Sequence, residues 1–284
     1  MRQIAIIYKH GRRDAADRAR QLKDWIEAKG FLVFIRENQA EPQLRHISHD
    51  LPLPEDLDLV IVLGGDGTLL SVARLLDNRG TPIIGVNLGG LGFLTEIGQQ
   101  QCRPDLEKVL DGHHEIEERM RLYATIQRHG QEVFRQPVLN DAVINKGALA
   151  RIVSLEVTID DRYLTHYRAD GLIVATPTGS TAYNLSAAGP IVYPTSRAII
   201  LTPICPFALT NRPIILPPEM TVQVRIGEPD QDIFMTCDGQ IGFALKPEDR
   251  IVFTAAAQPL RLIKPPSADY FEILRTKLKW GQTC

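Results

Sequence analysis

The stretch Leu57-Asp-Leu-Val-Ile-Val-Leu-Gly-Gly-Asp-Gly-Thr-Leu-Leu70 decides the fold, because it carries an apolar strand through a glycine-rich turn into the start of an apolar helix. Glycines at 64, 65 and 67 permit unusual backbone angles and leave N–H groups uncovered, so phosphate can approach the main chain at a helix N-terminus. Asp66 does not suit a simple anion site, because its carboxylate repels phosphate. A carboxylate does suit a group that takes a proton from an attacking hydroxyl or that contacts a phosphate-bound metal. The alternative is that Asp66 only caps the helix, as aspartate often does.

Strand and helix patterns alternate on both sides of this stretch. We expect strands at 4–8, 31–35, 57–63 and 82–86 and helices at 14–29, 68–76 and 104–110. This order predicts an α/β domain over residues 1–115, with a Rossmann-like, mostly parallel sheet. A second glycine-rich loop, Asn87–Leu94, follows the last of these strands. Loops at the carboxyl ends of parallel strands form the ligand crevice of open α/β sheets, so both glycine loops should lie on that edge.

From residue 116 the pattern changes to short runs of alternating polarity. Examples are 121–128, 132–136, 152–159, 172–175, 221–226 and 250–254. They predict a second, mainly antiparallel β-domain over residues 116–258. The remaining segment, 259–284, should contain a helix at 268–279, with Ser267 as its cap and Asp269 favourable in its first turn.

Composition excludes several classes of protein. The chain has 284 residues, 44% of them hydrophobic and 23% charged, with a net charge of −2, which shows no overall basic excess for nucleic acid or anionic membranes. No apolar run is long enough for a secretory signal or a membrane span. The four cysteines are scattered without metal-ligand spacing, so we identify no protein metal site. We expect a soluble, cytoplasmic protein with no nucleic-acid or membrane partner.

Three further segments carry polar groups in unusual places. Arg168–Gly189 reads as a strand, a hydroxyl-rich turn and a small-residue helix, which suits a polar ligand or an ordinary capped helix. Asn140 and Asp141 interrupt the apolar run 138–144, where an unpaired buried polar group costs about 1–3 kcal/mol. Cys237-Asp-Gly-Gln240 is typical of a β-turn. Because the sequence has neither a Walker A pattern nor a G-x-G-x-x-G fingerprint, P-loop enzymes and ordinary Rossmann dehydrogenases are disfavoured.

Taken in order, four of these motifs resemble the bacterial NAD kinase family. They are Gly64-Gly-Asp-Gly67, Asn140-Asp141, Thr176-Pro-Thr-Gly-Ser-Thr-Ala-Tyr-Asn184 and Asp238-Gly-Gln240. The first is shared with diacylglycerol and sphingosine kinases and is similar to a motif of phosphofructokinases, whereas the third makes the assignment specific. Leu88–Thr95 also resembles the second glycine loop of this family, so the resemblance covers nearly the whole chain.

The resemblance implies transfer of the γ-phosphoryl group of ATP to the 2′-hydroxyl of the adenosine ribose of NAD, giving NADP. Asp66 would be the general base, and a divalent metal, Mg²⁺, would accompany ATP. The phosphate-donor loop would comprise Gly64, Gly65, Gly67 and Thr68. The substrate-binding residues would be Asp66, Gly67, Asn140, Asp141, Arg151, Arg168, Asp170, Thr181, Ala182, Tyr183, Ser186 and Gln240. Many relatives carry glutamate in place of Asp141, so the shorter side chain changes the contact distance here.

The same resemblance implies a sandwich-like second domain, a C-terminal helix that returns to the first domain, and homodimers or homotetramers. Two alternatives stay open: a lipid kinase of the diacylglycerol type with the same glycine loop, and a dinucleotide sensor without catalysis. Inorganic polyphosphate is compatible with the same chemistry as ATP. The sequence leaves open the choice between NAD and NADH, feedback by NADP(H) and the preferred metal.

Overall fold

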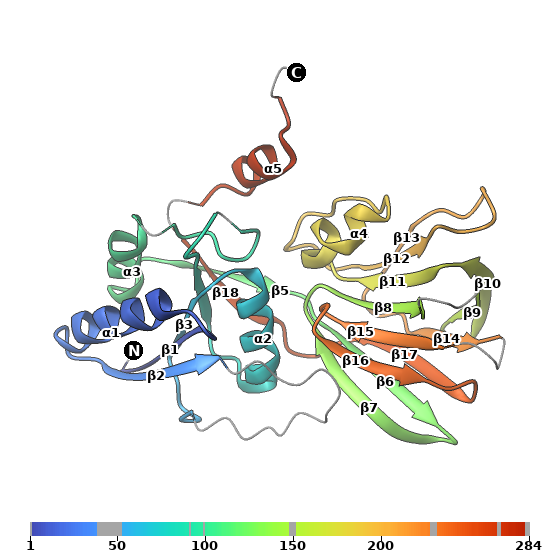
Figure 1. The fold of residues 1–284 in the computed structure, drawn as a ribbon, viewed down its shortest axis with the longest axis horizontal. Coiled ribbons are helices and arrows are strands. Elements are labelled where there is room, and N and C mark those ends of the chain that lie inside the picture. The colour runs from blue at the N-terminus through green and yellow to red at the C-terminus, as the bar shows by residue number, and fades with distance from the viewer. Residues whose placement is uncertain are drawn as a thin grey trace. The chain divides into compact units, whose positions relative to one another are not determined.

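The structure, a computed structural model, describes residues 2–38, 53–90, 92–98, 100–147, 152–227, 232–265 and 268–281. These residues form two compact units. Unit 1 contains the described parts of 2–118 together with 261–281, and unit 2 contains those of 119–260. The chain therefore leaves unit 1, builds unit 2 and returns to unit 1 (Figure 1).

Unit 1 is built on one six-stranded sheet with the strand order β2-β1-β3-β4-β18-β5. Its strands are β1 (Gln3–Lys9), β2 (Leu32–Asn38), β3 (Leu59–Leu63), β4 (Ile83–Val86), β5 (Glu115–Arg119) and β18 (Leu260–Lys264). Strands β1 to β4 pair in parallel, as predicted, and β18 joins β4 in parallel through Leu262 and Ile83. A strand at the end of the chain thus completes the sheet of the first domain, which the sequence analysis did not predict.

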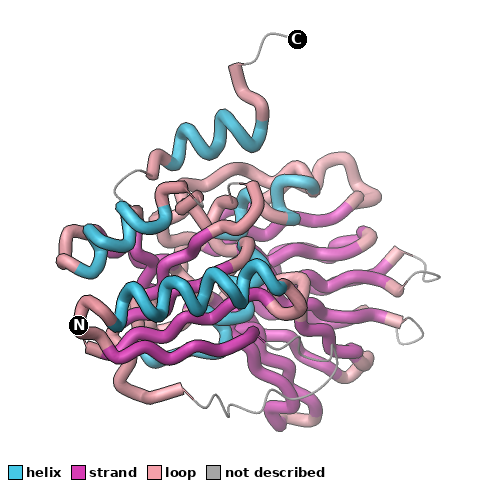
Figure 2. The backbone as a smooth tube through the Cα atoms, turned by 60° about the vertical axis from the view of Figure 1, so that its left-hand side comes forward, coloured by secondary structure: helices cyan, strands magenta, loops and turns pink. Residues whose placement is uncertain are grey.

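The helices of unit 1 are α1 (Arg13–Glu27), α2 (Asp66–Leu76), the 3-10 turn η1 (Asp77–Arg79), α3 (Cys102–Leu110) and α5 (Tyr270–Leu278). The predicted apolar stripe of α1 packs into the core against Ile4 and Ile6 of β1. The tube in Figure 2 shows this helix running along the strands. Helix α5 begins two residues later than predicted, because the side chain of Asp269 accepts the N–H of Phe271 and caps it. The predicted cap, Ser267, lies outside the described residues.

Unit 2 consists of two six-stranded sheets, with strand orders β10-β9-β14-β17-β6-β7 and β13-β12-β11-β8-β15-β16. The first contains β6 (Leu122–Arg128), β7 (Gln131–Val138), β9 (Val153–Ile159), β10 (Arg162–Ala169), β14 (Val222–Ile226) and β17 (Asp249–Ala255). The second contains β8 (Asp141–Lys146), β11 (Gly171–Ala175), β12 (Ile199–Ile204), β13 (Ile214–Leu216), β15 (Ile233–Cys237) and β16 (Ile241–Leu245). Neighbouring strands are antiparallel throughout, which confirms the predicted fold class.

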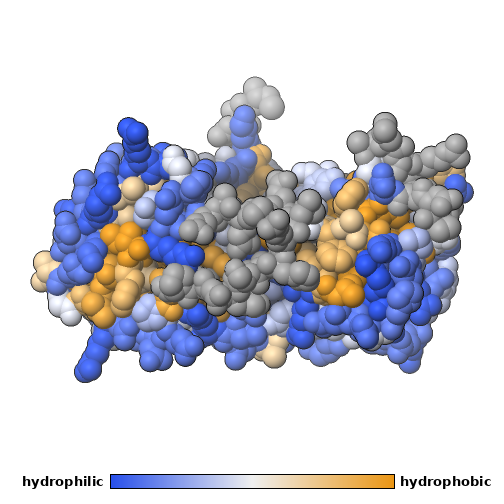
Figure 3. All heavy atoms as spheres, turned by 60° about the horizontal axis from the view of Figure 1, so that its bottom comes forward, coloured by the Kyte–Doolittle hydropathy of each residue, from blue (hydrophilic) through white to orange (hydrophobic). Residues whose placement is uncertain are grey.

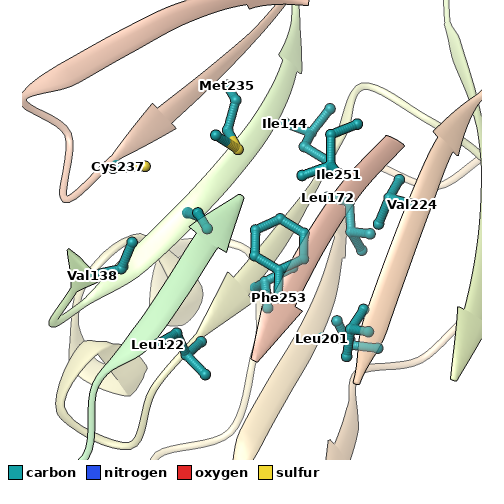
Figure 4. Close-up of a cluster of buried hydrophobic side chains, with 14 of the residues drawn as sticks. Leu122, Val138, Ile144, Leu172, Leu201, Val224, Met235, Cys237, Ile251 and Phe253 are labelled. Carbon is teal, nitrogen blue, oxygen red and sulfur yellow. The ribbon is translucent and has the colours of Figure 1, made fainter. Parts of the chain in front are cut away.

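Alternate residues of both sheets form one shared core. Leu122, Val224 and Phe253 from one sheet meet Ile144 and Leu172 from the other (Figure 4). Successive strand residues point to opposite faces. The intervening residues of the second sheet therefore form a separate apolar layer, made of Val143, Ile173, Ala175, Ile200 and Ile204, on which Ala187 and Val192 pack. The segment after β11 consequently covers the outer face of the second sheet.

The described surface is largely polar, with some clusters of apolar side chains (Figure 3). Within the described part of the chain, no helix has the length and hydropathy needed to cross a membrane. Cys102 and Cys237 are buried and Cys205 is exposed, none of the three in a disulfide, and Cys284 lies outside the described residues.

Candidate active site

Asp66 is the first residue of α2, directly after the turn that follows β3. The N-cap position is Gly65, in an extended conformation, and no side chain caps this end of the helix. The interpretation of Asp66 as a helix cap is therefore wrong. Its carboxylate faces another loop of the same unit.

The Asp66 carboxylate joins the two glycine-rich loops of unit 1. Oδ2 accepts the N–H of Phe93 at 2.9 Å, and Oδ1 accepts the N–H groups of Leu94 at 3.1 Å and Thr95 at 3.0 Å. The hydroxyl of Thr95 donates to Oδ1 at 2.9 Å. At Gly92 a Cβ atom would collide with Asp66 Oδ1 and Thr95 Oγ1, so only glycine fits there. The sequence analysis did not identify Thr95 as a site residue.

In the first glycine loop, lack of space requires glycine at Gly64, whereas a Cβ at Gly65 would meet no heavy atom within 4 Å. Neither Gly64 nor Gly65 has a positive φ, contrary to the expectation that unusual angles require them. A Cβ at Gly64 would lie 2.8 Å from Cβ of Thr68. Thr68 is buried, and its N–H bonds to the carbonyl of Gly65 at 2.9 Å. The glycine loop thus packs closely against the first turn of α2. Gly67, in that first turn, is exposed.

In unit 2 the chain bends between β7 and β8, so Asn140 and Asp141 do not belong to one continuous strand. The carboxylate of Asp238 holds the bend, with Oδ1 accepting the N–H groups of Leu139 at 3.1 Å, Asn140 at 2.7 Å and Asp141 at 3.3 Å. Asp238 and Gly239 both have positive φ, as a type I′ turn requires, which confirms the predicted turn. Sequence reasoning did not assign a site role to Asp238 itself, although its D-G pair marks the position.

The carboxyl group of Asp141 is buried beside this turn, and only 4% of the residue is exposed. Burial and the negative charge of Asp238 raise its pKa to about 7, although a hydrogen bond from the backbone of Tyr183 acts in the opposite direction. The protonation state of Asp141 therefore changes near neutral pH. This follows from its surroundings and is not visible in the motif.

The hydroxyl-rich turn packs on the same bend. It contains the 3-10 helix η2 (Thr178–Thr181) and the single-turn helix α4 (Tyr183–Ser186), in place of the longer helix that we expected. Thr176 donates its N–H to the carbonyl of Asn140 at 2.9 Å and its hydroxyl to the carbonyl of Leu139. A Cβ at Gly179 would collide with the backbone of Asn140. Three motifs that are far apart in sequence thus meet in unit 2.

The other predicted residues of unit 2 are distributed unevenly. Thr181 and Ala182 are half-buried and Tyr183 and Ser186 are exposed next to the bend, while Gln240 is half-buried after the Asp238 turn. Asn184 is fully buried; its Nδ2 donates to two carbonyl groups and its Oδ1 accepts from Thr202, so its role is structural.

Arg168 and Asp170 lie away from this cluster. Ala175 pairs with Asp141 and Gly171 pairs with Asn145, which puts Asp170 at the opposite end of β11. Asp170 forms an ion pair with Lys146 at 2.7 Å, and the Arg168 guanidinium stacks 5.5 Å from the Phe207 ring. Arg151 lies outside the described residues. In the described part of the chain, no group of three or more histidine, cysteine or acidic residues is arranged to hold a metal ion.

Comparison with known proteins gives consistent matches over the whole chain. Residues 4–114 match the family model of the ATP-NAD kinase N-terminal domain, and residues 139–265 match that of the ATP-NAD kinase C-terminal domain. An NAD kinase of Syntrophobacter fumaroxidans is 59% identical over 282 residues, covering 99% of this chain and all of the relative. An NAD kinase of Geotalea daltonii is 49% identical over 287 residues, with the same coverage.

Two solved structures share the fold. A yeast NADH kinase complexed with NADH superposes with a TM-score of 0.85 at 24% identity, covering 100% of this chain and 89% of that one. An NAD kinase from Archaeoglobus fulgidus in complex with ATP superposes with a TM-score of 0.77 at 25% identity, covering 98% of both chains.

Proposed function

Because the chain belongs to the NAD kinase family, we propose that Asp66 is the general base of the phosphoryl transfer. The reaction moves the γ-phosphoryl group of ATP to the 2′-hydroxyl of the adenosine ribose of NAD and yields NADP. The hydroxyl loses its proton as it attacks, so a correctly placed carboxylate assists the step. The matches over the full chain favour this activity over a lipid kinase or a dinucleotide sensor.

The observation that carries the proposal is the fixed position of the Asp66 carboxylate. Four hydrogen bonds hold it between the two glycine loops, at the start of α2. A base must lie within hydrogen-bond reach of the proton that it removes, and a fixed carboxylate loses little orientational freedom when the substrate binds. Most of the remaining catalysis of phosphoryl transfer comes from alignment and from stabilising charge on the phosphates.

The phosphate-donor loop of the proposal comprises Gly64, Gly65, Gly67 and Thr68. The start of a helix carries a partial positive charge that favours anionic phosphates, which supports this assignment. The N–H groups of Gly64 and Thr68 bond to the carbonyls of Val86 and Gly65, so the support comes from the helix end and not from these two N–H groups. Mg²⁺ is usually held by substrate phosphates and one or two carboxylates, so an ion that accompanies ATP would need few ligands from the protein. Such an ion, when bound, neutralises charge on the phosphates.

Unit 2 supplies the proposed dinucleotide site. Asn140 and Asp141, held by Asp238, would bind ribose hydroxyls, and Tyr183 offers an exposed aromatic ring next to them. The further members of the proposed set are Gly67, Arg151, Arg168, Asp170, Thr181, Ala182, Ser186 and Gln240. We also propose a cytoplasmic location, assembly into homodimers or homotetramers, and Mg²⁺ as the divalent metal. Polyphosphate remains an alternative donor to test.

The decisive test compares the wild type with Asp66→Asn, which keeps the size of the side chain and replaces the basic carboxylate by a neutral amide. We expect turnover of NAD with Mg·ATP to fall by at least about a hundredfold, while the dissociation constant for NAD changes little. NADP formation can be followed with an NADP-specific dehydrogenase and NAD binding by calorimetry. Equal losses of turnover and of NAD binding would assign Asp66 a purely structural role.

A further inference from the structure

The hydroxyl of Thr95 is the middle of a buried hydrogen-bond chain that ends on Asp66. Nδ2 of Asn87 donates to Oγ1 of Thr95 at 2.8 Å, and the same Oγ1 lies 2.9 Å from Oδ1 of Asp66. Asn87 is 7% exposed and Thr95 is fully buried. Water therefore has little access to Asn87 and Thr95, and their orientation is set by the protein.

The direction of this chain follows from its first member. Oδ1 of Asn87 accepts the N–H of Gly89 at 2.8 Å, which identifies the oxygen of the amide and leaves Nδ2 facing Thr95. A hydroxyl that receives an N–H has one hydrogen of its own to donate, and an ionised carboxylate only accepts. The hydrogen of Thr95 is therefore directed at Asp66.

The two oxygens of Asp66 consequently differ. Oδ1 accepts three donors, from the N–H groups of Leu94 and Thr95 and from the Thr95 hydroxyl. Among the described residues, Oδ2 accepts a hydrogen bond only from the N–H of Phe93. Each carboxylate oxygen has about two lone-pair sites, so Oδ1 is saturated and Oδ2 retains a site for a substrate hydroxyl.

We propose that Thr95, oriented by Asn87, is a positioning residue that fixes Asp66 so that Oδ2 accepts the proton of the substrate hydroxyl. The inference rests on the proposed role of Asp66 as general base. The terminal torsion of an aspartate side chain is broad and nearly two-fold, so the backbone N–H groups alone define its rotation less sharply. A misplacement of about 1 Å at a reacting group can cost about a hundredfold in rate.

The test uses the full chain with three variants. Thr95→Val keeps the shape of the side chain and removes the hydroxyl, and Thr95→Ser keeps the hydroxyl. Asn87→Asp retains an acceptor for the N–H of Gly89 but removes the donor to Thr95. This variant tests the same hydrogen-bond chain if Thr95→Val does not fold. Thr81→Val is the matched control, because Thr81 is a buried threonine of the same unit, 6% exposed, outside the hydrogen-bond chain.

We expect Thr95→Val to lower kcat by about tenfold to a hundredfold while KM for NAD stays within about twofold. Asn87→Asp should show the same pattern, Thr95→Ser should recover most of kcat, and Thr81→Val should match the wild type. A wild-type kcat in Thr95→Val, or equal losses in its valine and serine variants, would overturn the inference. Failure of the base assignment looks different, because Asp66→Asn would then retain turnover or lose turnover and NAD binding equally.

Discussion

Asp141 links the stability of the protein to pH at the scale of one residue. Its pKa of about 7 lies above the ordinary value of about 3.9, so the folded chain holds a proton that the unfolded chain releases between these values. The stability that this group contributes is full below about pH 3.9 and is lost as pH rises through 7. We expect Asp141→Asn to melt at an increasingly higher temperature than the wild type between pH 5 and 8.

Scanning calorimetry of both proteins over this pH range measures the difference in melting temperature. We expect the melting temperature of Asp141→Asn minus that of the wild type to rise with pH and to become constant above about pH 8. Above that pH, Asp141 is ionised in both the folded and the unfolded wild type. A difference that does not vary with pH would show that the folded pKa of Asp141 is ordinary.

The sequence singled out individual residues but did not indicate their hydrogen-bond partners. Asp66 stands out because a carboxylate is unusual in a glycine turn. The N–H groups that donate hydrogen bonds to it belong to residues 93–95, almost thirty positions later. The same holds for Asp238, whose carboxylate serves N–H groups about a hundred positions earlier. Such contacts depend on how loops fold against one another, and local propensity does not contain that information.

At the scale of elements, the second glycine loop has to approach α2 without side chains in between. Gly92→Ala would place a Cβ against Asp66 Oδ1 and Thr95 Oγ1, so one of them must move. We expect a loss of kcat of at least about tenfold, with an overpacking cost of about 1–3 kcal/mol in the free energy of unfolding. Initial rates and urea unfolding measure the two effects separately.

Gly98→Ala is the control for this substitution. Its Cβ would meet no heavy atom within 4 Å and its φ is not positive, so turnover and stability should stay near those of the wild type. If Gly92→Ala were as active as this control, the packing of the loop on Asp66 would not matter for catalysis.

Elements with strong local signals were predicted well, and those that depend on distant pairing were not. The stripe Ala15, Ala19, Leu22 and Ile26 identified α1, and all four residues are buried. Strand β18 was missed, because the five residues Leu260–Lys264 become a strand only through pairing with a sheet formed more than 140 positions earlier. The bend at Asn140 was missed because it depends on the carboxylate of Asp238.

At the scale of the whole molecule, the described residues of unit 1 come from both ends of the chain, whereas those of unit 2 all lie between positions 119 and 260. Unit 2 has its own sandwich core, including Phe253 and Leu172, so a fragment of residues 119–260 should fold alone. Residues 2–118 should not, because β18 lies between β4 and β5 and its absence leaves the inner edges of both without partners. Circular dichroism melts and amide NMR spectra of the two fragments test this expectation.

A third protein provides the control, in which residues 2–118 are joined to 260–281 by a Gly/Ser linker. A flexible linker of about ten residues spans about 17 Å on average, which lets β18 return to its place without unit 2. We expect this protein to melt cooperatively, whereas the fragment lacking β18 shows no transition. Cooperative melting of residues 2–118 alone would mean that β18 is dispensable, and the sheet of unit 1 would then be stable without the end of the chain.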